Sequence, residues 1–266
     1  MTAVLVAFLI AGPASAGGRE LRVCADPNNL PFSNARREGF ENQLADLLAR
    51  ELQATVRYTW WAQRRGFIRN TLNAGLCDVV LGVPLGFDPV LTTRAYYRSS
   101  YGFLSRRDRA LALGSLEDPR LAELRIGVHL VGGDNAATPP AYLLARRGLV
   151  DNVVGYTVYG DYREPNPPAR LVEAVAHGDV DVALVWGPLA GYFASRQAVP
   201  LEFVPVMAAP DSGPLPLTFA IAAGVRKGDV GLRDALDRAL ERKRPAIEML
   251  LDGYGVPRLP PGAPGP

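Results

Sequence analysis

The stretch Asp78-Val79-Val80-Leu81-Gly82-Val83 decides the fold class of this 266-residue chain. Its near-continuous apolar character is typical of a parallel β-strand that is covered on both faces. Residues 21–25 and 56–60 form two earlier candidate strands, and the apolar spacing from Phe40 to Leu52 predicts an amphipathic helix between them. A second helix is expected to run through Leu76. Because strands and helices alternate, the sequence predicts an α/β fold.

The same pattern begins again in the second half of the chain. Candidate strands at 124–128, 153–158 and 180–185 alternate with a helix that begins at Pro139 and another that ends before Gly178. Two such series predict two α/β lobes with a cleft between them.

The lobes are expected to be discontinuous in sequence. A single core stops growing near roughly 250 to 300 residues, so a chain of this length favours two moderate cores. We assign residues 20–106 and 213–259 to lobe 1 and residues 107–212 to lobe 2. The C-terminal part should contain a strand at 218–222 and then helical faces that break or restart at Pro245.

The two ends of the chain differ from the rest. Residues 1–16 resemble a secretory signal peptide, with an apolar run followed by the small residues Ala14-Ser15-Ala16. No Lys or Arg precedes the run, which suggests a true start upstream of Met1. The run is too short to cross a membrane, which needs about 20 apolar residues. The tail, residues 260–266, is rich in Pro and Gly and is predicted to be disordered.

Charge and cysteine content exclude some functions. The 29 basic and 27 acidic side chains leave a net charge of +2, which argues against a nucleic-acid-binding protein. The two cysteines, Cys24 and Cys77, could form a disulfide in an oxidising compartment, but their positions in the predicted strands leave this open. The spacing of cysteines and histidines indicates neither a metal site nor a bound cofactor.

The functional site is expected in the cleft, because ligands of open α/β sheets bind beyond the carboxyl ends of the strands. The segment that follows the second strand holds two of the three tryptophans and the adjacent Arg64 and Arg65. Alternation along the strand assigns Trp60 to the core and Trp61 to the cleft.

Five motifs together resemble one protein family. They are Arg22 to Asn34, Gly39 to Asn42, Gln63 to Phe67, Tyr96 to Tyr101 and Trp186 to Tyr192. They resemble the quinoprotein-dehydrogenase-associated solute-binding-like proteins of the MxaJ/XoxJ type, the J proteins of methanol oxidation systems. The resemblance implies a bilobal type II periplasmic-binding-protein fold and a periplasmic location. It also implies that the protein accompanies a PQQ-dependent alcohol dehydrogenase and its cytochrome c.

The sequence disfavours the binding of an ordinary amino acid. Relatives that bind amino acids hold the ligand carboxylate with an arginine after the lobe 1 strand. Here Arg94 is the comparable residue, but it lies too close to Tyr96. Those relatives hold the ammonium with an acid after a lobe 2 strand, where this chain has Trp186, which offers only an apolar face and one N–H donor.

Aromatic and arginine residues dominate the predicted cleft, a composition typical of protein interfaces. About half of the six candidate aromatic residues are expected to be core instead. Asp134, Asn135 and Thr138 could bind an anion at a helix start, although helix capping explains them equally well. The predicted cleft residues are Asp26, Asn28, Phe32, Trp61, Gln63, Arg64, Arg65, Tyr96, Tyr97, Arg98, Asp134, Thr138, Trp186 and Tyr192.

Catalysis is not expected. Asp26 or Glu41 could serve as a single cleft carboxylate, but no catalytic motif spacing is present. His129 ends a predicted strand and His177 a predicted helix, which favours structural roles. We therefore predict a non-catalytic periplasmic accessory protein that engages a PQQ-dependent alcohol dehydrogenase. A solute receptor for a small organic molecule is the alternative.

Overall fold

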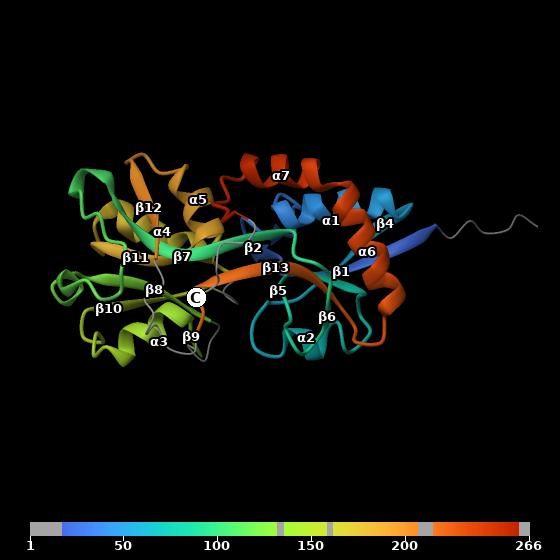
Figure 1. The fold of residues 1–266 in the computed structure, drawn as a ribbon, viewed down its shortest axis with the longest axis horizontal. Helices are drawn as coiled ribbons and strands as arrows, with labels where there is room; N and C mark the ends of the chain where they lie inside the picture. Colours follow the sequence, from blue (N-terminus) through green and yellow to red (C-terminus); the bar gives the residue numbers. More distant parts are fainter. Residues whose placement is uncertain (1–17, 132–135, 159–161, 207–214, 261–266) are drawn as a thin grey trace, which may run out of the picture.

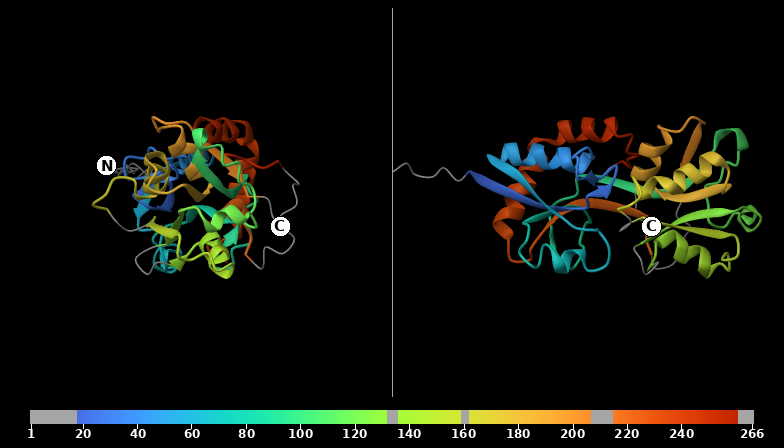
Figure 2. Two further views of the ribbon diagram at one scale, coloured as in Figure 1. Left: turned by 90° about the vertical axis from the view of Figure 1, so that its left-hand side faces the viewer. Right: turned by 180° about the vertical axis from the view of Figure 1, so that it is seen from behind.

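The computed structural model describes residues 18–131, 136–158, 162–206 and 215–260. These residues form two α/β lobes side by side, joined by two long strands (Figures 1 and 2). The bilobal α/β prediction is therefore confirmed. The predicted signal peptide and nearly all of the predicted disordered tail lie outside the described residues.

Lobe 1 is a sheet covered by helices on both faces. Its strands β1 (Arg19–Ala25), β4 (Ala54–Trp60) and β5 (Val79–Pro84) are parallel, as the apolar run at 78–83 predicts. Its helices are α1 (Phe40–Glu51), α2 (Phe67–Asn70), α6 (Val230–Arg242) and α7 (Arg244–Gly253). Alternation divides the strand side chains between two cores: Val79 and Leu81 pack with the α1, α6 and α7 side, and Val80 and Val83 with the α2 side.

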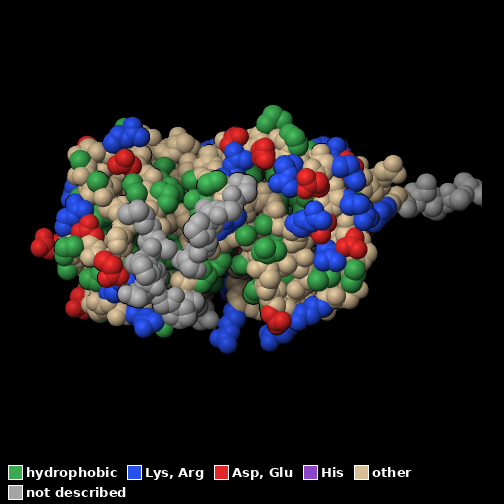
Figure 3. All heavy atoms as spheres, viewed as in Figure 1, with side chains coloured by type: hydrophobic (Ala, Val, Ile, Leu, Met, Phe, Trp, Pro, Cys, Tyr) green, Lys and Arg blue, Asp and Glu red, His purple; other side chains and the backbone are tan. Residues whose placement is uncertain are grey.

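Lobe 2 repeats the arrangement with the second series of strands. The parallel strands are β8 (Ile126–Val131), β10 (Val153–Thr157) and β11 (Val182–Trp186), and β12 (Leu201–Pro205) lies at one side. Its helices are α3 (Pro139–Arg146), α4 (Arg170–His177) and α5 (Gly187–Ala194). In the space-filling view, acidic and basic side chains are interspersed over the surface, in keeping with the small net charge (Figure 3).

Two antiparallel strands connect the lobes. The first residues of β7 (Tyr97–Arg106) pair with β13 (Thr218–Val225), and the later residues pair with β11 and β12. The strand β7 is thus shared by both lobes, and the predicted boundary after residue 106 lies at its end. The continuous hydrogen-bonded order is β10-β8-β11-β7-β13-β5-β1-β4.

Shorter elements fill the connections. They are β2 (Asn28–Asn29), β3 (Ser33–Asn34), β6 (Leu91–Thr92), β9 (Ala136–Ala137) and the 3-10 helices η1 (Arg107–Arg109), η2 (Pro119–Ala122) and η3 (Pro167–Ala169).

The second predicted helix is much shorter than expected. The helix α2 ends at Asn70 instead of running through Leu76. The Thr71 hydroxyl donates to the Phe67 carbonyl, and Gly75 takes a positive φ of 75°, so turns replace the remaining helix.

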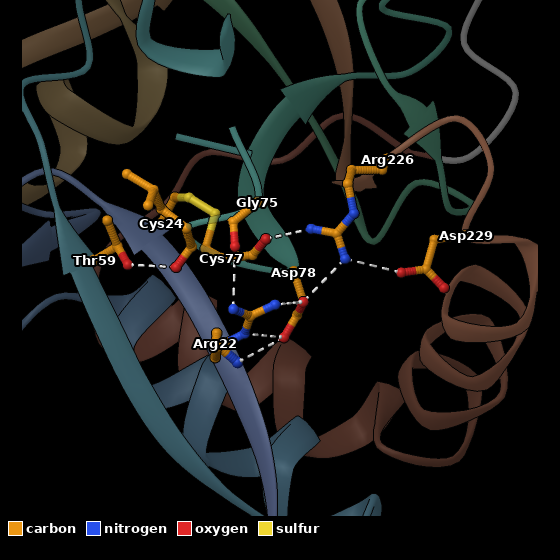
Figure 4. A network of polar contacts seen from close by, with 9 residues as sticks. Arg22, Cys24, Thr59, Gly75, Cys77, Asp78, Arg226 and Asp229 are labelled. Atoms are coloured by element: carbon orange, nitrogen blue, oxygen red, sulfur yellow. Dashed lines mark hydrogen bonds and ion pairs between the residues drawn. A yellow bond between two sulfur atoms is a disulfide. The ribbon is translucent and has the colours of Figure 1, made fainter. Parts of the chain in front are cut away.

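A disulfide and an ion-pair network link β1 to the two residues that precede β5 (Figure 4). Cys24 and Cys77 are bonded, with Cα atoms 5.5 Å apart, which settles the open question from the sequence. Arg22 donates two hydrogen bonds to Asp78, from Nε at 2.9 Å and from Nη2 at 2.6 Å, and Arg226 reaches the same carboxylate at 3.0 Å. The network joins β1, β5 and the segment that follows β13.

Trp60 is less buried than predicted. Its ring stacks on Tyr58 with centroids 4.4 Å apart, on the strand face that alternation predicts. The strand β4 is the edge of the sheet, so the stack is only half-buried.

Candidate functional site

A cavity of about 240 Å³ lies between the lobes. We call it the inter-lobe cavity. Each parallel strand contributes a lining residue at or just beyond its carboxyl end, as expected for an open α/β sheet. These residues are Asn29, Gln63 and Pro84 from lobe 1 and Val131, Val158 and Trp186 from lobe 2.

Aromatic rings form much of the cavity wall. Trp186 ends β11 and packs against Tyr101 and Phe219, with ring centroids 5.3 and 5.8 Å apart. Phe32 and Tyr97 line the lobe 1 side, and both pack edge-on against the buried Phe40. Trp186 therefore packs against both connecting strands, β7 and β13, while it lines the cavity.

The polar groups of the cavity are neutral and mostly satisfied within the protein. Thr138 is at the N-cap position of α3, but its hydroxyl donates to the His129 carbonyl at 2.8 Å instead of capping the helix. His129 contacts the Pro168 carbonyl through Nε2 at 3.2 Å, and burial lowers its pKa to about 4. His129 is thus a neutral, hydrogen-bonded residue, and the exposed His177 ends α4.

Asn29 has a hydrogen-bond acceptor that is not used within the protein. Its Nδ2 donates to Gln63 Oε1 at 3.3 Å, while its Oδ1 is buried without a hydrogen-bond partner. Among the described residues that line the cavity there is no Asp, Glu, Lys or Arg. The inter-lobe cavity therefore suits an apolar, uncharged group with at most a few hydrogen bonds.

Asp26 lies beside the cavity and organises its lobe 1 side. Its carboxylate accepts hydrogen bonds from the backbone N–H groups of Asn28 at 2.8 Å and Gln63 at 2.7 Å. Burial raises the pKa of Asp26, and these two bonds oppose the rise. The residue holds together the loops after β1 and β4, so its carboxylate is engaged by the protein itself.

Glu41 lies behind the cavity wall. Its carboxyl group touches Gly82, where even a methyl side chain would collide with it. Burial raises the pKa of Glu41 well above its usual value, which favours the neutral acid. Neither candidate carboxyl group lines the inter-lobe cavity.

A second hollow, of about 430 Å³, opens on lobe 1 beside the first. We call it the arginine groove. It shares Gln63, Gly82 and Pro84 with the inter-lobe cavity. The remaining lining residues are Arg64, Arg65, Gly66, Phe67, Ile68, Arg69, Asn73, Val80, Val83, Phe87 and Pro89.

The predicted cleft residues thus fall into several places. Five of them line the inter-lobe cavity: Phe32, Gln63, Tyr97, Thr138 and Trp186. Arg64 and Arg65 line the arginine groove. Asp26 and Asn28 lie beside the inter-lobe cavity. Asp134 and its neighbour Asn135 lie outside the described residues.

Four predicted residues lie away from the inter-lobe cavity. The Tyr96 hydroxyl is buried without a hydrogen-bond partner in lobe 1, and Tyr192 stacks on Tyr254 where the lobes pack together. Arg98 follows the cavity residue Tyr97 on β7, and successive strand residues point to opposite faces. Trp61 lies past the end of the edge strand β4 and is 41% exposed.

Sequence reasoning also missed several lining residues. Asn29, Pro84 and Val158 could have been found: Val158 ends a predicted strand, Pro84 directly follows one, and Asn29 lies in the loop after another. Tyr101, Phe219 and Ile221 come from the connecting strands β7 and β13, and strand pairing brings them to the cavity. Leu189 comes from α5, which directly follows β11.

Arg94 lies outside the inter-lobe cavity. Its backbone N–H donates to Asp237 Oδ1 at 2.7 Å, beside α6. The backbone of Arg94 therefore helps to fix a loop, and Arg94 does not line the inter-lobe cavity, whereas Trp186 does.

Comparison with known proteins follows this geometry. No family model matches the chain. The curated Protein MoxJ of Methylorubrum extorquens is 34% identical over 252 residues, which cover 90% of this chain and 82% of that protein. This chain belongs to the MoxJ family.

Two solved structures of similar proteins support membership of the MoxJ family. The periplasmic binding protein XoxJ from Methylobacterium extorquens AM1 has a TM-score of 0.73 at 34% identity, over 90% of this chain and 99% of that one. MxaJ from Methlophaga aminisulfidivorans MPT has a TM-score of 0.78 at 28% identity, over 90% and 100%. The resemblance drawn from the motifs and the type II periplasmic-binding-protein fold are both confirmed.

Within the ranges that the structure covers, the helices are too short or too polar to cross a bilayer. The same ranges hold no cluster of three or more His, Cys, Asp or Glu side chains arranged to bind a metal.

Proposed function

We propose that this member of the MoxJ family is a non-catalytic periplasmic accessory protein. It engages a PQQ-dependent alcohol dehydrogenase of a methanol oxidation system, and through it the cytochrome c partner, by way of the cleft between its lobes. The cleft here comprises the inter-lobe cavity and the adjoining arginine groove.

The described residues that line the inter-lobe cavity carry no charge, and this observation supports the proposal. A free amino acid would bring a carboxylate and an ammonium into the cavity, and both would lose hydration without an opposite charge in return. The ring of Trp186 stands where a carboxylate would be needed. An apolar side chain of a protein partner would instead gain by leaving water and packing against Trp186, Tyr101 and Phe219.

The proposal is tested by measuring complex formation and dehydrogenase turnover with and without this protein. Val131→Phe would fill the cavity at the end of β8, and we expect it to weaken the complex roughly tenfold or more. Val150→Phe makes the same change at a surface position that is 54% exposed, and it should bind like the wild type. An unchanged turnover together with no complex would remove the accessory function.

A solute receptor is the second candidate, and one observation favours it. The unpartnered Asn29 Oδ1 could accept a hydrogen bond from a small neutral molecule such as an alcohol or an amide. Calorimetric titration with neutral alcohols and amides tests this candidate. Saturable binding that Val131→Phe abolishes would support it, and no heat with any of them would contradict it.

A further inference from the structure

We propose that the arginine groove binds an acidic segment of a partner protein through one apolar anchor residue flanked by carboxylates. This inference rests on the proposed function, since the partner is the dehydrogenase or its cytochrome. It adds the chemistry of the segment that is recognised and places the contact on lobe 1.

The charge of the groove is one-sided. Arg64, Arg65 and Arg69 line it and are exposed, and the part of the groove that the structure describes is lined by no acidic residue. In Figure 3, several Lys and Arg side chains and one acidic side chain lie along the lower edge of lobe 1, where α2 lies in Figure 1. Guanidinium groups pair with carboxylates through two parallel hydrogen bonds, so this rim matches acidic side chains.

Two described acids near the groove, Asp88 and Asp26, are engaged elsewhere. Asp88 follows the lining residue Phe87, but its side chain is 95% exposed and pairs with Lys227 at 3.2 Å. Asp26 is buried, and its carboxylate is already held by two backbone N–H groups. Neither of these two acids therefore competes for a carboxylate that approaches Arg64 and Arg69 from outside.

The floor of the groove is apolar, which distinguishes a protein segment from a simple anion. Phe67 and Val83 are buried beneath it, and Phe87 is 37% exposed in its wall. Leu85, between the lining residues Pro84 and Phe87, is 52% exposed. An inorganic anion would gain nothing from this surface, whereas an aromatic or aliphatic side chain would bury area against it.

The volume of the arginine groove also fits a protein segment. The groove, at about 430 Å³, is larger than the inter-lobe cavity and continues into it through Gln63, Gly82 and Pro84. A segment that enters the inter-lobe cavity from lobe 1 would cross the groove on its way. The arginine rim would then fix the acidic part of the segment while an apolar residue lies on the floor.

The experiment uses three fluorescein-labelled nonapeptides and the full-length protein. One peptide has a central Phe flanked by four Asp or Glu on each side, a second replaces this Phe by Ser, and a third replaces the acids by Lys. Fluorescence anisotropy should show binding of the first peptide, binding weaker by roughly tenfold for the second, and none for the third. Raising NaCl from 0.05 to 0.5 M should weaken binding of the first, because salt screens exposed charges.

Matched variants locate the contact. Arg69→Glu reverses one charge in the groove, and Arg50→Glu reverses an equally exposed arginine on α1, outside it. Arg69→Glu should weaken both the peptide and the dehydrogenase complex by roughly tenfold, and Arg50→Glu should leave both unchanged. Circular dichroism confirms that each variant is folded.

The outcomes separate this inference from the proposed function. If the wild type binds the dehydrogenase but Arg69→Glu and Arg50→Glu behave alike, the groove inference is overturned and the accessory function stands. If the acidic peptide binds in the groove but the dehydrogenase does not, the accessory function fails and the groove inference stands. Equal binding of the Phe and Ser peptides, displaced by millimolar phosphate, would reduce the groove to an anion site and overturn the inference.

Discussion

Two of the contacts between the lobes differ in chemistry. At the first, α5 of lobe 2 lies beside the end of α7 of lobe 1 (Figure 1), and Tyr192 stacks on Tyr254 with centroids 5.7 Å apart. Gly191 approaches Gly255 so closely that a Cβ atom on Gly191 would collide with the Gly255 carbonyl oxygen. We call this set of four residues the tyrosine contact.

The second contact consists of hydrogen bonds from one side chain. Asn28 Nδ2 donates to the Glu164 carbonyl at 2.8 Å, and the Asn166 N–H donates to Asn28 Oδ1 at 3.1 Å. We call it the asparagine contact. Both bonds are partly exposed, so water can replace them at little cost.

The difference indicates how the cleft would open. Separation at the tyrosine contact would expose stacked rings and a close backbone approach. Separation at the asparagine contact would exchange two hydrogen bonds for water and uncover one buried side chain, Leu30, which packs with residues of lobe 2. We therefore expect the lobes to pivot on the tyrosine contact and on β7 and β13, and to part at the asparagine contact. The following substitutions test that asymmetry.

The largest effect is expected at the tyrosine contact. Gly191→Ala places a methyl group against the Gly255 carbonyl, so α5 and the end of α7 must separate, and we expect a loss of about 3 kcal/mol in the free energy of unfolding. The control is Gly253→Ala at the end of α7, where a Cβ atom meets nothing within 4 Å. Urea denaturation measures both, and equal stability of the two variants would contradict a rigid tyrosine contact.

The next effect concerns the segment around Asn166, whose backbone N–H donates to Asn28. His129 contacts the Pro168 carbonyl, in η3 next to Asn166, and burial lowers the pKa of His129 to about 4. The unfolded chain takes up this proton near pH 6.5, before the folded protein does. Stability should therefore fall as the pH drops from about 6.5 to about 4, by up to ~3 kcal/mol from this residue.

The buried acids act in the opposite direction. Burial raises the pKa values of Asp26 and Glu41, so their contributions favour the folded state as the pH falls. The difference between the wild type and His129→Gln isolates the histidine, because glutamine keeps an N–H donor without titrating in this range. Unfolding curves at several pH values provide the measurement, and a difference that does not vary between pH 7 and pH 4 would contradict the neutral, buried histidine.

The sequence predicted the place of the cavity better than its lining. Strand periodicity and the rule for open sheets located the ends of β1, β5 and β11, because both depend only on local pattern and topology. Trp186 was placed correctly at a strand end for this reason. The sequence also predicted the restart of the last helices at Pro245, which lies in the first turn of α7.

The failures share a physical cause. Tyr192 lies on a helix whose partner Tyr254 is distant in sequence, and no local pattern indicates that the two rings stack. Trp61 lies just past a strand end, where alternation no longer fixes the side-chain direction. The length of α2 was also missed, because the side chain of Thr71 and the positive φ of Gly75 outweigh the apolar spacing.

The smallest effect is expected at the asparagine contact. Asn28→Ala removes the two hydrogen bonds described above, and because they are partly exposed we expect a loss of only about 1 kcal/mol in stability. Amide hydrogen exchange should report the change more strongly, with faster exchange at Asn166 and unchanged exchange at Gly255. Asn28→Asp keeps the acceptor for the Asn166 N–H but loses the donor to Glu164, so its exchange should lie between the two. Faster exchange at Gly255 instead would place the pivot at the asparagine contact and reverse the proposed direction of opening.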